Sequence, residues 1–228
     1  MTSRERFHAT VSFGQPDVPF IRPIGGWPQT VERWKREGWD GRPIHEIFGA
    51  DDYEMAGVNY GPQPPFEREV IEEDDRVRIV RDEEGVLLRE LKNNTETSMP
   101  QFLKFPVENR EDFRRLRKER LRLSYTDRVP SDWEQKMSRW PNRTYPVMCK
   151  TGRHGGFFGP LREFMGLEGL CLAFHDDLVL IEKMMEDRAD AVIDITGEVL
   201  KETSFDVIML WEDMAYKTGS LVDPRLFR

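Results

Sequence analysis

The clearest pattern of apolar positions lies in the last third of the chain. Apolar residues recur every three or four positions over 178–199, which predicts a long amphipathic helix with Asp176 or Asp177 as its N-cap. Continuous apolar runs at 145–149 and 206–211 predict buried strands before and after that helix. Strands that alternate with helices are typical of a parallel sheet with right-handed crossovers.

The N-terminal part repeats this order on a smaller scale. Thr2 and Glu5 stand three residues apart, as in a capping box, and predict a short first helix. The apolar run 17–22 predicts a brief strand. A glycine-rich turn follows it, and Pro28 then starts an amphipathic helix that ends near Gly38.

The middle of the chain is rich in charge. Two apolar stretches, 77–80 and 86–88, flank a turn with Gly85 at its end and predict a β-hairpin within a charged insertion at 67–92. Helices are predicted at 109–122 and 132–140. Charge of this density is typical of a solvated face.

These elements predict an α/β fold of the (β/α)8 TIM-barrel type. The chain has 228 residues, whereas such a barrel takes about 250, and the charged insertion uses part of that length. We therefore expect one partial barrel domain over 1–228, with about the first five β/α units. Asp223 and Pro224 start a helix that stops after about one turn, so truncation at the C-terminus is expected.

Charge and composition narrow the functional classes. The 34 Lys and Arg residues face 42 Asp and Glu residues, a net charge of −8, which argues against a nucleic-acid partner. The chain lacks an apolar stretch of membrane-spanning length, and its N-terminus lacks the apolar core of a signal peptide, so a cytoplasmic protein is expected. Cys149 and Cys171 form neither a disulfide framework nor a zinc motif, and no cofactor is identifiable from spacing.

Polar groups that follow the predicted strands are the candidates for chemistry, because barrel enzymes react at the carboxyl ends of their strands. The loop after 145–149 combines Lys150, Arg153 and His154 with three glycines, and suits a carboxylate or phosphate group on a substrate. A flexible loop without a ligand is the alternative.

Two further strand ends carry charge. Arg22 follows the first predicted strand, with a surface ion pair as its alternative role. Glu212 and Asp213 follow the strand at 206–211, where one of them can face the mouth of a barrel as an acid, a base or a polar anchor.

Three segments resemble the uroporphyrinogen decarboxylase superfamily, and in particular its branch related to corrinoid-dependent methyltransferases. They are TSRERFHATVSFGQPDVPF at 2–20, GGWPQTVERWKREG at 25–38 and DVIMLWEDMAYKTGSLVDPRLFR at 206–228. The resemblance implies a (β/α)8 barrel whose chain continues beyond this C-terminus. It also implies one of two reactions: decarboxylation of a porphyrinogen in haem biosynthesis, or transfer of a methyl group from a corrinoid to a thiol activated by zinc.

The decarboxylase pattern matches this chain only in part. Arg22 matches the first of its two arginines, and Gly26 stands in place of the second. Phe164 occupies the position of its tyrosine, and Asp213 that of its serine. Its catalytic aspartate falls near 74–75. A porphyrinogen carries many carboxylates, which need charge-assisted partners, and the negative Asp213 would repel them. Methyl transfer is therefore the leading interpretation.

The positions at strand ends and the resemblance together give roles to particular residues. Asp213 and Arg22 are expected to be catalytic, and the substrate contacts are expected to be Arg22, Lys150, Arg153, His154, Phe164 and Glu212. The expected partners are a small-molecule substrate and a corrinoid protein, with zinc held by ligands outside this chain. The alternatives are a uroporphyrinogen decarboxylase, or an inactive partial barrel that binds a partner or self-associates through an open sheet edge.

Overall fold

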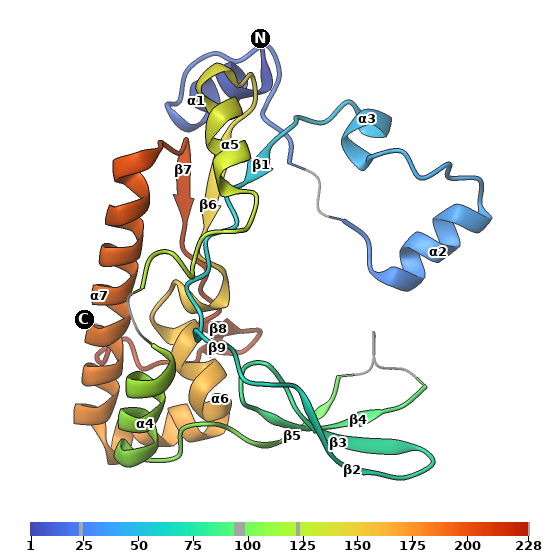
Figure 1. Ribbon diagram of the computed structural model, residues 1–228. Coiled ribbons are helices and arrows are strands. Elements are labelled where there is room, and N and C mark those ends of the chain that lie inside the picture. The colour runs from blue at the N-terminus through green and yellow to red at the C-terminus, as the bar shows by residue number, and fades with distance from the viewer. Residues whose placement is uncertain (23–24, 94–98, 122–123, 228) are drawn as a thin grey trace. The chain divides into compact units, whose positions relative to one another are not determined.

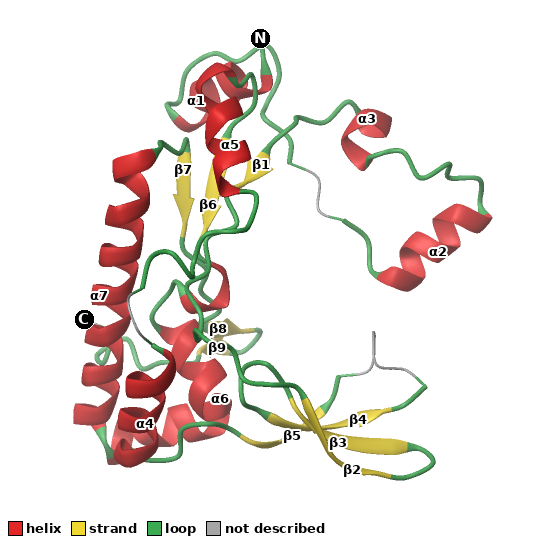
Figure 2. Ribbon diagram, viewed as in Figure 1, coloured by secondary structure: helices red, strands yellow, loops and turns green. Residues whose placement is uncertain are grey.

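The computed structural model describes residues 1–22, 25–93, 99–121 and 124–227, and the fold is mixed α/β (Figures 1 and 2). The chain forms two compact units, one of 1–57, 131–149 and 203–208, and the other of 58–130, 150–202 and 209–228. Within the described residues, none of the helices is long and apolar enough to cross a membrane.

The first unit contains a parallel sheet in the strand order β1-β6-β7. Its strands are β1 Glu54–Met55, β6 Val147–Lys150 and β7 Val207–Met209, of which Lys150 and Met209 belong to the second unit. β1 pairs in parallel with β6. Hydrogen bonds from the Asp206 amide to Val147 and from the Thr151 amide to Met209 give β7 the same direction. The parallel sheet of the α/β prediction is therefore confirmed, and closure of a barrel stays a prediction.

Short helices complete the first unit. They are α1 Ser3–Val11, α2 Pro28–Arg36, α3 Ile44–Phe48, α5 Trp133–Arg139 and the 3-10 turn Trp140–Asn142. The predicted capping box is present, because Thr2 accepts from the Glu5 amide while the Glu5 carboxylate accepts from the Thr2 amide. The predicted strand at 17–22 is wrong: this segment is irregular, and the Asp17 side chain binds Arg6 and the N-terminal amine.

A buried carboxylate organises the first unit. Asp206 accepts hydrogen bonds from Arg143 at 2.9 and 3.0 Å and from the Val147 amide at 2.9 Å, and the Asp206 and Arg143 side chains are 1% and 3% exposed. Arg4 and His8 of α1 bind its other oxygen at 2.8 and 2.6 Å. Burial raises the pKa of Asp206, but the hydrogen bonds from Val147, Arg4, His8 and Arg143 outweigh it and lower that pKa to about 2.

We expect Asp206→Asn to lower the free energy of unfolding by about 3–5 kcal/mol, because the Arg143 guanidinium then stays buried without its counter-charge. Because folding lowers the pKa of Asp206, its carboxylate stabilises the fold at pH values above the ordinary pKa of 3.8. This stability is lost as the pH falls through about 2. The variant should lack this acid dependence in urea denaturation at pH 2–5. Asp40→Asn, at an exposed pair with Arg42, is the control and should cost under about 1 kcal/mol.

The second unit contains an antiparallel sheet in the order β2-β3-β4-β5. Its strands are β2 Glu69–Glu73, β3 Val77–Arg81, β4 Leu87–Leu91 and β5 Gln101–Lys104. The predicted hairpin is confirmed as β3 and β4, joined by a turn in which Gly85 has a φ of +86°. Val80, Val86 and Leu88 form a small buried cluster, while every β2 side chain is exposed.

Helices form the larger core of this unit. They are α4 Arg110–Arg120, α6 Phe158–Asp176 and α7 Leu178–Glu202, followed by the short strands β8 Ala215–Tyr216 and β9 Gly219–Ser220. The predicted helices at 109–122 and 178–199 are confirmed, and α6 and α7 run side by side (Figure 1). The strand predicted at 206–211 is shorter than expected, and the predicted terminal helix is a hydrogen-bonded turn from Asp223.

Helix α6 has a break at Gly166, whose φ of +71° is unfavourable for other residue types. The Phe105 ring lies so close to this glycine that a Cβ atom would overlap it. The break therefore lets a residue from the β5–α4 connection pack directly against the α6 main chain.

Gly166→Ala should lower the free energy of unfolding by about 2–4 kcal/mol, through backbone strain and the clash with Phe105. Gly197→Ala is the matched control, since this exposed glycine of α7 has open space around it. It should stabilise the chain by about 0.5–1 kcal/mol. Equal effects of the two substitutions in chemical denaturation would contradict the assignment of the break.

Candidate functional site

The segments that follow three parallel strands form the candidate site in the second unit. Residues 58–61 follow β1, residues 150–156 begin with the last residue of β6, and residues 210–213 follow β7. Because the strands are parallel and β6 is the central one, their carboxyl ends lie on the same edge of the sheet. Ligands of α/β proteins bind at this edge.

The loop after β6 is attached to the end of β7. Thr151 donates to the Met209 carbonyl with both its amide and its hydroxyl, each at 3.0 Å. A Cβ atom on Gly155 would overlap the Thr151 side chain, and one on Gly156 would overlap the Trp211 carbonyl and the Glu212 carboxylate. The two glycines therefore permit a close approach that no other residue type allows.

Glu212 caps the N-terminus of α6. Its carboxylate accepts hydrogen bonds from the amides of Phe157, of Phe158 at 3.2 Å and of Gly159 at 2.9 Å. A carboxylate at this position satisfies unpaired N–H groups and interacts favourably with the helix dipole. Glu212, predicted to contact the substrate, therefore stabilises the start of α6.

Asp213, expected to be catalytic, lies beside the same helix. Its side chain is 52% exposed and forms an ion pair with Arg162 at 2.9 Å. The Arg162 guanidinium lies 5.3 Å above the Trp211 ring. Asp213 therefore keeps access to solvent, whereas Glu212 is half-buried.

His154 is the most enclosed of the predicted site residues that carry a titratable group. It is 9% exposed, and its ring stacks on the Phe164 ring with 5.7 Å between centroids. Gly61 covers its edge, since a Cβ atom there would lie 2.8 Å from His154 Cδ2. Phe164, the other predicted substrate contact at this point, is buried in the helical core and supports the imidazole.

The two cations of the loop face solvent. Lys150 is exposed at the end of β6, and Arg153 lies 3.5 Å from Glu163 with 67% of its side chain exposed. Exposed and weakly paired cations of this kind can still bind an anionic group of a ligand.

Arg22 belongs to the first unit, whereas the other six predicted residues belong to the second. Its guanidinium lies 3.9 Å from the Met148 sulfur and 5.4 Å above the Tyr53 ring. Asp74, near the expected position of a decarboxylase aspartate, accepts from the amides of Arg76 and Val77 in the β2–β3 turn, and these two bonds lower its pKa.

Sequence reasoning missed the segment 58–61. The Arg128 guanidinium donates to the carbonyls of Asn59 and Gly61, at 3.1 and 2.9 Å, and Arg188 donates to the Tyr60 carbonyl at 3.2 Å. Burial, followed by the nearby charge of Arg128, lowers the pKa of Arg188 to about 10. The sequence pattern could have pointed to Arg188, because position 188 lies in the buried stripe of α7, seven residues from both Ile181 and Ile195.

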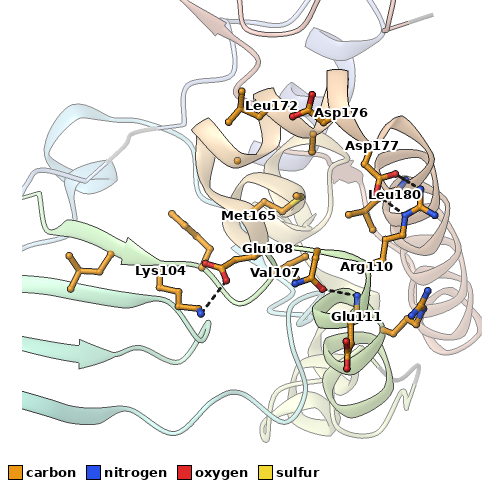
Figure 3. Close-up of a pocket in the computed structure, with 16 residues that line it drawn as sticks. Lys104, Val107, Glu108, Arg110, Glu111, Met165, Leu172, Asp176, Asp177 and Leu180 are labelled. Atoms are coloured by element: carbon orange, nitrogen blue, oxygen red, sulfur yellow. Dashed lines mark hydrogen bonds and ion pairs between the residues drawn. The ribbon is translucent and has the colours of Figure 1, made fainter.

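A separate hollow of about 720 Å³ lies between the start of α4 and the second half of α6 (Figure 3). Its apolar lining includes Val107, Met165 and Leu180, and an ion pair between Arg110 and Asp177 lies on its rim. None of the predicted site residues lines it.

Comparison with known proteins identifies no match for this chain. No protein-family model, no curated protein and no solved structure matches the chain. The site is therefore interpreted from its own geometry.

We expect Glu212→Ala to lower the free energy of unfolding by about 1–2 kcal/mol, because three amides of α6 lose their acceptor. Asp213→Ala should change it by less than about 1 kcal/mol, since its ion pair is exposed. Urea denaturation followed by circular dichroism measures both. A larger loss at Asp213 than at Glu212 would reverse the assignment of the cap.

Proposed function

We propose that this chain is an enzyme of the uroporphyrinogen decarboxylase superfamily, with a (β/α)8-type fold, and that it transfers a methyl group from a corrinoid to a thiol. Its place is the cytoplasm, and its partners are a small thiol substrate and a corrinoid protein. The observation that carries the proposal is the gathering of 58–61, 150–156 and 210–213 at the carboxyl ends of three parallel strands.

The charges at this edge favour methyl transfer over decarboxylation. Lys150 and Arg153 supply two exposed positive charges, enough for one carboxylate or phosphate on a small substrate. Glu212 and Asp213 place two negative charges nearby, and these would repel the many carboxylates of a porphyrinogen. A small thiol with a single anionic group avoids that repulsion.

The roles follow from the contacts. Lys150 and Arg153 bind the anionic group, while the buried His154 faces the reacting part of the substrate. Asp213, exposed beside Arg162, acts as a polar or acid–base group, and Glu212 keeps the start of α6 in place. Arg22 belongs to the first unit, and the expectation that it contacts the substrate stays a prediction.

Zinc activates the thiol in the methyltransferases that the chain resembles. Among residues 1–22, 25–93, 99–121 and 124–227, no three His, Cys, Asp or Glu side chains gather in a way that could hold a metal ion. These residues therefore do not fit a zinc site.

The test is methyl transfer from a methylated corrinoid to a small anionic thiol by the purified chain. The corrinoid spectrum should change as the thioether forms. Lys150→Ala and Arg153→Ala should each raise KM for the thiol by about tenfold or more, because each removes a charge-assisted contact. Lys201→Ala, on the exposed face of α7, should leave KM unchanged.

Two other results would contradict the proposal. Loss of carboxylates from uroporphyrinogen without methyl transfer would assign the chain to the decarboxylases. Absence of both reactions, together with a concentration-dependent increase in mass in sedimentation, would favour a binding protein that self-associates through its sheet edge.

A further inference from the structure

An aromatic hollow of about 360 Å³ lies in the first unit, where the chain passes from the end of α2 to α3. Its apolar lining consists of Trp34, Trp39, Ile47 and Phe48. Phe48 is 73% exposed, so aromatic surface meets solvent here. None of the predicted site residues lines this hollow.

The two tryptophan rings of the aromatic hollow are held at right angles. Their planes make an angle of 88°, with 6.1 Å between the centroids. The Trp39 amide donates to the Trp34 carbonyl at 2.8 Å, and the Trp39 indole Nε1 donates to the Arg42 carbonyl at 3.0 Å. Gly26 packs against the other ring, since a Cβ atom there would lie 3.1 Å from Trp34. The two rings therefore form a corner in which one compact group can contact both of them.

Carboxylates line the same hollow. Glu37, directly after α2, and Asp40 contribute two negative charges, and Arg42 contributes one positive charge. Asp40 accepts from the Arg42 amide at 3.0 Å and from its guanidinium at 2.7 Å, which balances the charge of that guanidinium. Glu37 supplies the excess negative charge, because Arg33, 3.5 Å from it, does not line the hollow.

We propose that the aromatic hollow binds the quaternary ammonium group of a small molecule, with Trp34 and Trp39 as its walls and Glu37 as its counter-charge. The face of an aromatic ring attracts a cation that lies within about 6 Å of the centroid, and the indole ring does so most strongly. A quaternary ammonium has no N–H group, so its methyl groups can pack on the rings without leaving a donor unpaired. A volume of about 360 Å³ is near the lower end of the range for ligand pockets and suits one small molecule.

Choline is the probe for this site, and 3,3-dimethylbutan-1-ol, which has the same shape without the charge, is the matched ligand control. In isothermal titration calorimetry with the full chain, choline should bind at least about tenfold more tightly than the alcohol, because only the cation is attracted by the ring faces. Equal affinities, or no binding of choline, would overturn the proposal.

Trp39→Ala should weaken the binding of choline by about tenfold or more, because it removes one wall of the corner. Trp27→Ala is the matched control, since Trp27 is 73% exposed and does not line the hollow. This variant should bind choline as the wild type does. Equal losses in the two variants would contradict the assignment of the walls.

Glu37→Gln removes a charge and leaves both rings in place. It should weaken the binding of choline by about twofold to fivefold and leave the affinity for the neutral alcohol unchanged. Glu32→Gln, at an exposed position of α2 outside the hollow, should change neither affinity. An affinity for choline that does not respond to Glu37→Gln would overturn the role of this carboxylate.

NMR spectroscopy locates the ligand and separates its two sources. In ¹⁵N-edited spectra of the full chain, choline should shift the indole N–H signals of Trp34 and Trp39 and leave that of Trp27 in place. A peptide with a trimethylated lysine carries the same head group and should bind no more tightly than choline. Binding of the peptide that is more than about tenfold tighter would assign the hollow to a partner protein and overturn the assignment to a small molecule.

Discussion

The close approach between the loop after β6 and the end of β7 determines the geometry of the candidate site. Gly155 and Gly156 make that approach possible, because any side chain at either position would overlap Thr151 or the main chain at Trp211. Once the two segments are in contact, Glu212 reaches the first amides of α6. The orientation of α6 then places the Phe164 ring under His154. Close packing of the backbone thus underlies both the cap formed by Glu212 and the position of Phe164.

The charged insertion has two faces with different tasks. β2 is exposed along its whole length, as a solvated charged strand should be. The β3–β4 turn, in contrast, directs Glu84 to His154. Charge density predicted the first property, whereas the second depends on one residue of the turn.

Local signals explain which elements could be predicted from the sequence. The capping box at Thr2, the glycine turn at Gly85 and the apolar stripe of α7 each act within a few residues, and the structure confirms all three. The strand predicted at 17–22 failed because a strand needs a partner from elsewhere in the chain, and this segment has none in the described sheets. β1 was not predicted, because its two residues are too few to show a periodic pattern.

The site was predictable only where a segment follows a recognisable strand. Lys150, Arg153, His154, Glu212 and Asp213 were found in this way, and six of the seven predicted residues belong to one unit. Glu84 and Gly61 reach His154 from distant parts of the sequence. No local pattern encodes contacts of that kind.

The manner in which 59–61 is held has a consequence for how this chain can vary. Arg128 and Arg188 bind three main-chain carbonyls, a group that every residue type provides. These arginines therefore hold the segment without recognising its side chains. The side chains add a second hold, because Asn59 Oδ1 accepts from the Gly61 amide at 2.8 Å and the buried Tyr60 hydroxyl lies 2.9 Å from that of Thr196. The arginine contacts thus tolerate other side chains at 59 and 60, whereas these local bonds do not.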